Sequence, residues 1–484
     1  MNRVLQAWAR FDGHREALVD VGTGRRWTYA QLHRDALCWA GRLAAEGVGP
    51  GDVVAVLAHN RGESLAVLYA AAELGAIFFP LNWRLSVPEL RWQLGHSGAR
   101  VLLTDAGHAT VLDRPSLSLD DGPGPTAYQG PGAGAEDPWM LLYTSGSSGR
   151  PKGALIPHRQ AHHNAVNTVL ACDLTREDTT LTFTPLFHTG GLNCLTTPLF
   201  FRGGRVVLTP GFDAAQALAL VAQERISLLM GVPTIFQLLH DHPAFGHADL
   251  SSVRDALCGG APLGADLLAR YLDRGIPLRQ GFGMTECGPN CFGTPPDQVS
   301  QRLGTVGQPI HFLGTRVVRP DGTSCDADEP GELQFKGPMV FAGYLGNPDA
   351  TAASFTGDGW FKTGDVLSVD ADGYYTVRGR LKEMYISGGE NVYPAEVEAV
   401  LLQCPGVAQA AVVGVPDPRW GEVGHAFLEP QPGVTLDPET VRAFVAPRLA
   451  RFKQPRHVDV RPLLPRTGSG KIDKLALRQT PLEA

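Results

Sequence analysis

Apolar and polar positions in the first hundred residues switch repeatedly between a helical and a strand period. Tyr29–Ala45 carries apolar residues at helical spacing, and residues 53–58 form a short apolar run. A second run at 76–80 leads into a Pro-rich turn, after which a helical pattern at 87–95 precedes the strand-like segment 99–104. Helices that alternate with short buried strands predict α/β layers.

The same alternation resumes after residues 121–138, a segment rich in Gly, Pro and Ala that predicts a surface loop. We predict helices at 214–224 and 262–274 between a further series of strands. These strands are 139–143, 180–184, Arg205–Leu208, Leu228–Gly231 and Asp255–Cys258.

The pattern changes again after Thr305, where short β-type runs are separated by Gly, Pro and Asp. Runs at 315–319, Gly331–Lys336 and 374–378 predict a β-rich subdomain. The last hundred residues predict a small α+β unit. Its elements are helix 395–403, strand 407–415, helix 438–449 and strand His457–Val460.

Composition and charge narrow the class of protein. A chain of 484 residues is too long for one hydrophobic core, so at least two domains are expected. The formal net charge of −7 argues against a nucleic-acid-binding surface, which carries a basic excess. No signal-peptide pattern opens the chain, and no apolar stretch reaches the roughly 20 residues of a membrane span, so we expect a cytoplasmic protein.

The eight cysteines show no metal-binding spacing. Cys287 and Cys291 come closest, but no second Cys or His pair follows them to complete a zinc site. We therefore expect buried free thiols.

Three segments carry groups suited to a nucleotide. The first, residues 143–153, follows an apolar run and predicts a phosphate cradle, because glycines let backbone N–H groups approach an anion and hydroxyls and an ammonium add donors. It is not a Walker loop, because Gly153 follows the lysine, and a flexible linker is the alternative reading. The cradle residues are Thr144, Ser145, Gly146, Ser147, Ser148, Gly149 and Lys152.

The second segment follows the small residues Gly259, Gly260 and Ala261 and the strand-like run Leu278–Gln280. A hydroxyl and a carboxylate at a strand end, Thr285 and Glu286, suit a phosphate oxygen and its magnesium ion. An ordinary helix N-terminal cap is the alternative. The residues between the strand and this pair are Gly281, Phe282, Gly283 and Met284.

The third segment spans 360–396 and contains Asp365, which could accept hydrogen bonds from two ribose hydroxyls, and Arg380, which could donate to the same sugar or to a phosphate. A turn aspartate and a surface arginine are the alternative readings. Near the C-terminus, Lys471 lies in the Gly-rich stretch 464–474, where a solvated basic tail is the alternative.

Taken together and in this order, these blocks resemble the adenylate-forming superfamily of acyl-CoA synthetases, luciferases and peptide-synthetase adenylation domains. The resemblance covers essentially the whole chain. Segments 185–190, 258–262, 386–394 and 417–422 look most like CoA ligases of the hydroxycinnamate and fatty-acid type.

The resemblance implies a fold and a reaction. It implies a large N-terminal domain, residues 1–381, of layered α/β subdomains plus a β-rich subdomain, and a small mobile C-terminal α+β domain, residues 382–484, with Lys382 as the hinge. A carboxylic acid would attack ATP to give acyl-AMP and pyrophosphate, and coenzyme A would then accept the acyl group.

The resemblance also assigns roles. Lys471, Glu286, Thr144 and His188 would be catalytic, with Glu286 as the magnesium ligand. ATP would contact the cradle, Gly260, Ala261, Gly281 to Thr285, Asp365, Arg380 and Lys471. The acyl pocket would comprise His188, Gly190, Gly191, Gly259, Gly260 and Gly281, and coenzyme A would meet Ser387, Gly388, Gly389, Trp420 and Phe452. Gln454 departs from relatives, which often have a basic residue there.

Three alternatives share most of these motifs. A luciferase-like oxygenase needs few extra groups, and a non-catalytic homologue would keep the fold. An amino-acid-activating domain would need a carboxylate to pair with the substrate ammonium, where this chain has His188. The sequence does not identify the acid, fatty or aromatic, and a homodimer is possible.

Overall fold

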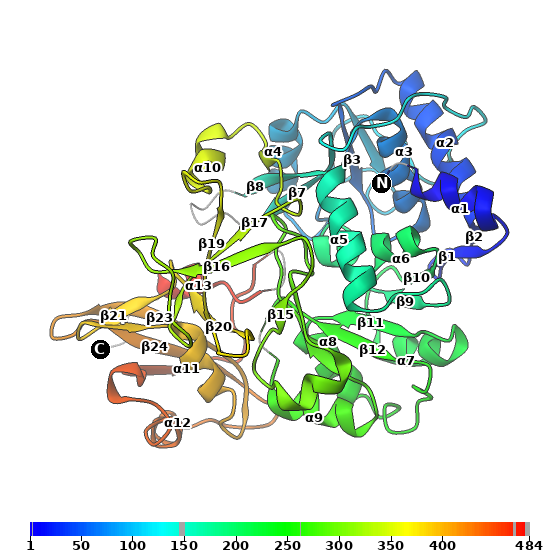
Figure 1. Ribbon diagram of the computed structural model, residues 1–484. Helices are drawn as coiled ribbons and strands as arrows, with labels where there is room; N and C mark the ends of the chain where they lie inside the picture. Colours follow the sequence, from blue (N-terminus) through cyan, green and yellow to red (C-terminus); the bar gives the residue numbers. More distant parts are fainter. Residues whose placement is uncertain (2, 145–150, 262, 468–470, 480–484) are drawn as a thin grey trace. The chain divides into compact units, whose positions relative to one another are not determined.

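The computed structural model describes residues 1, 3–144, 151–261, 263–467 and 471–479, and these form two compact units (Figure 1). Unit 1 comprises Met1–Thr315 and Phe335–Phe361. Unit 2 comprises Arg316–Gln334 and Lys362–Ala484. The predicted domain boundary at Lys382 lies inside unit 2 and remains a prediction about motion.

Unit 1 contains two seven-stranded sheets, both mainly parallel. All neighbours in the first sheet are parallel except β1 and β2. A parallel sheet needs helices over its faces, so its strands are buried, and polar groups gather where the strands end. In sheet order the strands are β13 (Leu278–Gln280), β12 (Asp255–Cys258), β11 (Leu228–Gly231), β9 (Thr179–Thr182), β10 (Arg205–Leu208), β1 (Glu16–Asp20) and β2 (Arg26–Thr28).

The second sheet is parallel from β7 to β6 and antiparallel at its other edge, where β8 pairs with both β7 and β18. In sheet order its strands are β18 (Gly343–Tyr344), β8 (Lys152–Pro157), β7 (Pro138–Thr144), β4 (Ile77–Pro80), β3 (Val53–Leu57), β5 (Val101–Thr104) and β6 (Leu117–Ser118). A separate two-stranded sheet joins β14 (Phe292–Gly293) to β15 (Gln308–Pro309).

Helices cover these sheets, and in the first sheet α7 contacts β9, α8 contacts β11 and α9 contacts β13 (Figure 1). Helix α2 begins at a capping box, in which the Thr28 hydroxyl accepts the Gln31 N–H and the Gln31 side chain accepts the Thr28 N–H. The α-helices of unit 1 are α1 (Val4–Asp12), α2 (Tyr29–Ala45), α3 (Gly62–Leu74), α4 (Val87–Ser97), α5 (His158–Ala171), α6 (Thr196–Arg202), α7 (Ala214–Gln223), α8 (Pro233–Asp241), α9 (Ala265–Asp273) and α10 (Pro348–Ala353). A π-helix spans Gly190–Cys194 and a 3₁₀-helix Pro296–Gln301.

Unit 2 contains most of one four-stranded sheet and all of a five-stranded sheet. The first has the order β16 (Gly314–Val318), β17 (Gly331–Lys336), β19 (Phe361–Val369), β20 (Tyr375–Arg380). The second has the order β22 (Glu390–Val392), β21 (Tyr385–Ser387), β24 (Gly421–Pro430), β23 (Val407–Asp417), with β25 (His457–Val460) parallel to β24. Helices α11 (Pro394–Leu401), α12 (Pro438–Val445) and α13 (Lys474–Arg478) and a 3₁₀-helix, Arg451–Lys453, complete the unit.

The predicted α/β class and the β-rich segment after residue 305 are confirmed, with small shifts at element ends. The helix predicted at 262–274 begins at Ala265, and the strand predicted at 374–378 runs from Tyr375 to Arg380. No described helix has the length and apolar character needed to cross a membrane. All eight cysteines are free, and seven of them are buried, as predicted.

His158, the first residue of α5, is a buried histidine held by stacking. Its ring lies on the Trp139 ring with centroids 5.1 Å apart, and the residue is 3% exposed. Neither ring nitrogen has a hydrogen-bond partner among the described residues. Burial, helped by the charge of the N-terminal amino group, lowers the pKa of His158 to about 3.

Replacing His158 with Phe should flatten the acid side of the stability profile. Between pH 6.5 and about 3 the unfolded chain binds a proton at His158 that the folded chain does not, so stability falls as the pH falls through this window. At pH 5 this loss amounts to about 2 kcal/mol relative to neutral pH.

Thermal melting of wild type and His158→Phe at pH 7 and pH 5 measures the effect, and the variant should lose less on acidification. His14→Phe is the control, because its side chain is 94% exposed. Equal losses in wild type and His158→Phe would contradict a neutral buried imidazole.

Candidate active site

The two ends of the predicted phosphate cradle are held together by strand pairing. β7 ends at Thr144 and β8 begins at Lys152, and these two residues stand directly opposite each other in the antiparallel ladder. Ser145, Gly146, Ser147, Ser148 and Gly149 lie outside the described residues. The backbone that carries the cradle therefore leaves and re-enters the sheet at one point.

Glu286 contacts one end of the cradle directly and is connected to the other end through Tyr344. Its Oε1 accepts a hydrogen bond from the Tyr344 hydroxyl at 3.0 Å and a long one, 3.5 Å, from the Thr144 hydroxyl. The Lys152 ammonium is 5.0 Å from the centre of the Tyr344 ring. Burial, together with the neighbouring Glu286 carboxylate, raises the pKa of the Tyr344 phenol, so this hydroxyl remains a donor. A carboxylate, two hydroxyls and an ammonium thus converge in unit 1.

The turn that presents Glu286 is not a helix cap. Met284 and Gly288 form a β-bridge across it, and the Glu286 carbonyl accepts the Phe341 N–H at 2.8 Å. A Cβ on Gly283 would lie 2.1 Å from the Pro289 carbonyl oxygen, so only glycine fits there. The helix-cap alternative for Thr285 and Glu286 is therefore wrong.

Small residues at two neighbouring strand ends leave space beside this turn. Gly259 follows β12 and Gly281 follows β13, and a Cβ on either would have no atom nearer than 3.9 Å apart from its chain neighbours. Gly260 has a φ of +82°, a conformation that glycine adopts without strain. Ala261, the last described residue of this segment, is exposed. Carboxyl ends of parallel strands are where open α/β sheets bind ligands.

His188 lies in the segment that follows β9 of the same sheet, in which β11 separates β9 from β12. It is half-buried, and its ring centre is 4.8 Å from that of Phe187, so it is not a fully enclosed core histidine. Gly190 approaches Met230, since its Cβ would lie 3.0 Å from the methionine methyl. Gly191 serves the backbone instead, because its Cβ would lie 2.3 Å from the Pro185 carbonyl oxygen.

Asn60 fixes the chain just before His188. Its side-chain amide donates to the Thr184 carbonyl at 3.0 Å and its oxygen accepts the Leu186 N–H at 2.9 Å. Sequence reasoning missed Asn60, because a single amide in a loop carries no periodic signal.

In unit 2, Asp365 and Arg380 face each other across β19 and β20. Arg380 Nε donates to Asp365 Oδ1 at 2.9 Å, and Asp365 is 5% exposed. Burial raises the pKa of the Asp365 carboxyl, and Arg380 opposes that rise. Asp365 and Arg380 therefore form an ion pair across two strands, and the alternative interpretation, an isolated turn aspartate and an isolated surface arginine, does not describe them.

Lys471 belongs to the electrostatic surroundings of the same pair. Part of the Lys471 side chain is exposed, but the protein around the ammonium disfavours the charged form and so lowers its pKa. The charge of Arg380 also lowers this pKa, whereas Asp365 and Glu383 raise it. The Lys471 carbonyl accepts the Thr467 N–H at 2.7 Å.

Lys474, three residues further on, is a second lysine of this segment whose role the sequence did not reveal. Its ammonium pairs with Glu383 at 2.7 Å and with Glu398 at 2.8 Å. These two carboxylates raise its pKa against the opposing effect of burial. Lys474 therefore anchors the start of α13 to α11 and to the turn after β20.

The predicted coenzyme A residues fall into two groups. Gly388 and Gly389, with φ of +61° and +88°, form the two-residue turn between β21 and β22 that follows Ser387, and the Gly388 N–H donates to the Trp420 carbonyl at 2.8 Å. Trp420 is 38% exposed beside this turn. Phe452 instead packs against the core of unit 2.

Gln454 has a structural role that accounts for its presence. Its side-chain amide donates to the Ala446 and Leu449 carbonyls at 3.1 and 2.8 Å, and these carbonyls belong to the chain that follows α12. A polar cap therefore stands where the resemblance led us to expect a basic residue.

Two family models match consecutive parts of the chain. The family model for an AMP-binding enzyme matches residues 5–345, and the model for its C-terminal domain matches residues 396–471.

Curated relatives match over nearly full length. The chain is 44% identical to a feruloyl-CoA synthase of Amycolatopsis sp over 99% of both chains. It is 39% identical to an indoleacetate–CoA ligase of Aromatoleum aromaticum, covering 94% of this chain and 93% of that protein.

A solved structure is similar at the level of the whole fold. The o-succinylbenzoate CoA synthetase of Bacillus subtilis, in complex with its acyl-adenylate intermediate, has a TM-score of 0.90 and 31% identity, covering 99% of this chain and 98% of that one. Another structure of that enzyme, with ATP and a magnesium ion, has a TM-score of 0.88 and 32% identity and covers 97% of this chain and 98% of that one.

Proposed function

The chain belongs to the AMP-binding enzyme family and is an AMP-forming acid–CoA ligase, and we propose that its carboxylic acid substrate is aromatic. The acid first forms an acyl-AMP, and coenzyme A then takes the acyl group. Ferulate-like and indole-like acids share a flat ring joined through a short chain to the carboxylate. The two curated relatives act on acids of this kind, as their names state.

The observation that carries the aromatic proposal is the space at the ends of β12 and β13. Gly259 and Gly281 leave room that any larger side chain would fill, and Met230 of β11 borders Gly190 nearby. Flat faces of backbone and a flexible methionine suit the face of a ring. His188 lies in the segment that follows β9, where we propose that it contacts the acid next to its carboxylate.

In the first half-reaction the acid carboxylate attacks the ATP α-phosphorus, the bond to the bridging oxygen breaks, and pyrophosphate leaves. We assign the cradle, from Thr144 to Lys152, to the phosphates that leave. Asp365 would accept hydrogen bonds from the ribose hydroxyls, with its carboxylate oriented by Arg380. Lys471 would meet the negative charge that develops at the α-phosphate, where a positioned cation stabilises the transition state most.

Glu286 is our proposed protein ligand for magnesium. The carboxylate with two neighbouring hydroxyls, Tyr344 and Thr144, offers the oxygen donors that magnesium prefers. When bound, the ion would neutralise phosphate charge. The Tyr344 hydroxyl would orient the carboxylate by its 3.0 Å hydrogen bond.

In the second half-reaction the coenzyme A thiol attacks the acyl carbonyl and AMP leaves with the electron pair of the broken anhydride bond. We propose that the segment from Lys382 onward rotates between the two steps and carries the Gly388–Gly389 turn to the acyl-AMP. Trp420, exposed beside that turn, is our candidate for contact with the coenzyme A nucleotide. Phe452, packed in the core, is a weaker candidate.

The substrate proposal is tested by comparing acids in a pyrophosphate-release assay. We expect kcat/KM for ferulate, cinnamate and indole-3-acetate to exceed that for octanoate and acetate by at least tenfold. Gly259→Ala should lower kcat/KM for ferulate about tenfold or more, because its Cβ clashes with no protein atom but occupies ring space.

Gly246→Ala is the matched control, because a Cβ there would meet no atom within 4 Å and Gly246 does not lie at the ends of β12 or β13. If octanoate were the best acid and Gly259→Ala left all acids unchanged, the aromatic pocket would be misplaced, although the ligase reaction would stand.

Glu286→Gln should raise the magnesium concentration needed for ATP–pyrophosphate exchange more than it raises the KM for the acid. The substitution keeps size and hydrogen-bonding capacity but removes the charge that attracts the cation. Thioester formation from synthetic acyl-AMP should hardly change, because pyrophosphate has already left. Superimposable magnesium titrations for wild type and variant would assign the metal to other groups.

Lys471→Ala should abolish acyl-AMP formation and leave thioester formation from synthetic acyl-AMP largely intact. The loss in the first step should be roughly 3 kcal/mol or more, about a hundredfold or greater in rate. Lys336→Ala is the control, because its ammonium donates to the Asp358 carbonyl within unit 1. Equal losses in both half-reactions would contradict this division of labour.

A further inference from the structure

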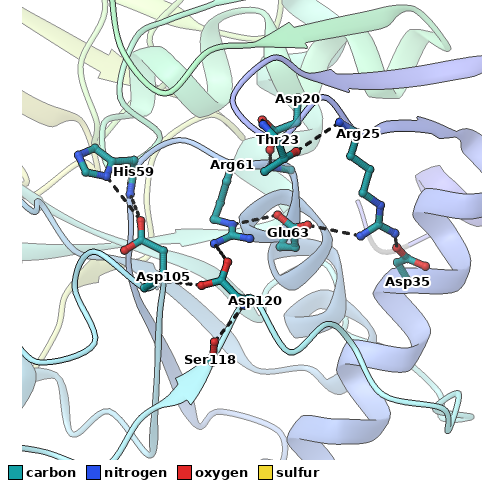
Figure 2. Close-up of polar contacts among 12 residues, drawn as sticks. Asp20, Thr23, Arg25, Asp35, His59, Arg61, Glu63, Asp105, Ser118 and Asp120 are labelled. Carbon is teal, nitrogen blue, oxygen red and sulfur yellow. Dashed lines mark hydrogen bonds and ion pairs between the residues drawn. The ribbon is translucent and has the colours of Figure 1, made fainter.

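Two histidines and an aspartate meet in unit 1 where the loop after β3 approaches the loop after β5, and Figure 2 shows two of the three, His59 and Asp105. The Asp105 carboxylate lies 3.5 Å from His59 Nδ1 and 2.6 Å from His108 Nδ1. One ligand atom from each of His59, Asp105 and His108 lies within 4.8 Å of the other two. Neither half-reaction uses any of these three residues.

The spacing of these atoms suits a small divalent ion. In a tetrahedral zinc centre each nitrogen or oxygen ligand stands about 2.0–2.1 Å from the metal, so ligand atoms are roughly 3.4 Å from one another. The 3.5 Å between His59 Nδ1 and Asp105 Oδ2 already matches this separation. A side-chain rotation of His108 would separate its nitrogen from Asp105 by the small remaining amount.

The carboxylate at the centre of the group is fixed by the backbone. Asp105 Oδ2 accepts the His59 N–H and Oδ1 accepts the His108 N–H, each at 3.0 Å. The ring of His59 also lies 4.6 Å from that of Trp83 and 4.8 Å from that of His108, measured between centroids. The position of the Asp105 carboxylate is therefore set before an ion arrives, which lowers the cost of binding.

A second layer of polar contacts supports the loop that contains Asp105 and His108. Asp120 accepts the Ala106 N–H at 2.9 Å and pairs with Arg61 at 2.7 Å, and Arg61 pairs in turn with Glu63 at 2.9 Å. Figure 2 shows this chain of charged groups running from the Asp105 loop to the start of α3. Supporting contacts of this kind orient the ligands of metal sites in proteins.

Exposure differs across the group in the way that an accessible metal site requires. The side chains of Asp105 and His108 are 12% and 10% exposed, whereas that of His59 is 45% exposed. An ion can therefore reach the ligands from the side of His59, and a water molecule can complete the coordination there.

We propose that His59, Asp105 and His108 bind one divalent transition-metal ion of the zinc class. Two imidazoles and one carboxylate favour zinc, cobalt or nickel over magnesium, which prefers oxygen ligands. On binding, the proton that His108 Nδ1 donates to Asp105 moves to Nε2, so that Nδ1 is free to coordinate. The site shares no residue with the proposed magnesium site at Glu286.

Such an ion would act on the acyl region through Asn60. Asn60 follows His59 directly and holds the Thr184 carbonyl and the Leu186 N–H, just before His188. Coordination of His59 would fix the loop from which Asn60 reaches this segment. The ion would therefore stabilise unit 1 at the ends of two sheets at once.

The test is a titration of chelator-treated, full-length protein with Co²⁺ and, in a second experiment, Zn²⁺. We expect one Co²⁺ per chain with visible absorption typical of nitrogen and oxygen ligands and without thiolate charge-transfer bands. Affinity should fall at least tenfold in His59→Ala and in His108→Ala and remain unchanged in His247→Ala, an exposed histidine elsewhere. Millimolar Mg²⁺ with ATP should not displace the ion.

Thermal melting gives a second measurement that is independent of activity. Saturating Zn²⁺ should raise the melting temperature of wild type and of His247→Ala but not of His59→Ala. The His59 side chain is 45% exposed, so the variant should fold and its melting temperature can be compared with that of wild type. Equal Co²⁺ affinity in wild type and His59→Ala, or thiolate bands that reveal cysteine ligands, would overturn the proposal.

Discussion

Antiparallel pairing of β8, with β7 on one side and β18 on the other, is the constraint on which the candidate phosphate site depends. The first pairing sets Thr144 opposite Lys152 and closes the cradle. The second sets Tyr344 opposite Ala154, from where its hydroxyl reaches Glu286. Backbone hydrogen bonds thus position side chains that are nearly 200 residues apart in the sequence. Glu286 then contacts two of these side chains, Thr144 and Tyr344.

Helices with a strong hydrophobic period and short apolar strands could be predicted from the sequence, whereas a uniformly buried helix could not. Tyr29–Ala45 was predicted to the residue, because it is amphipathic and begins at a capping box. The helix Gly62–Leu74 was not located, since twelve of its thirteen residues are buried and no polar face marks its period. The strand Gly421–Pro430 was missed because Gly and Glu interrupt its apolar run, although β21, β23 and β25 all pair with it.

The candidate site shows the same division between local and long-range information. Asp365 and Arg380 were identified from motifs, and their cross-strand ion pair follows from strand register. Tyr344 and Asn60 could not be found in this way, because each acts only through a partner distant in the sequence. For Gly191, which we expect in the acyl pocket as a small residue, the structure adds a second reason for glycine, because a Cβ there would clash with the backbone of its own turn.

The double ion pair of Lys474 has a mechanical consequence for Lys471. Both acidic partners, Glu383 and Glu398, lie on the C-terminal side of the predicted hinge at Lys382, as Lys471 itself does. The segment that carries Lys471 is therefore clamped to the body that would rotate, only three residues from the lysine. Rotation at Lys382 would move Lys471 together with this body as one rigid piece. The position that Lys471 reaches would therefore depend on the angle at the hinge and not on the flexibility of a terminal segment.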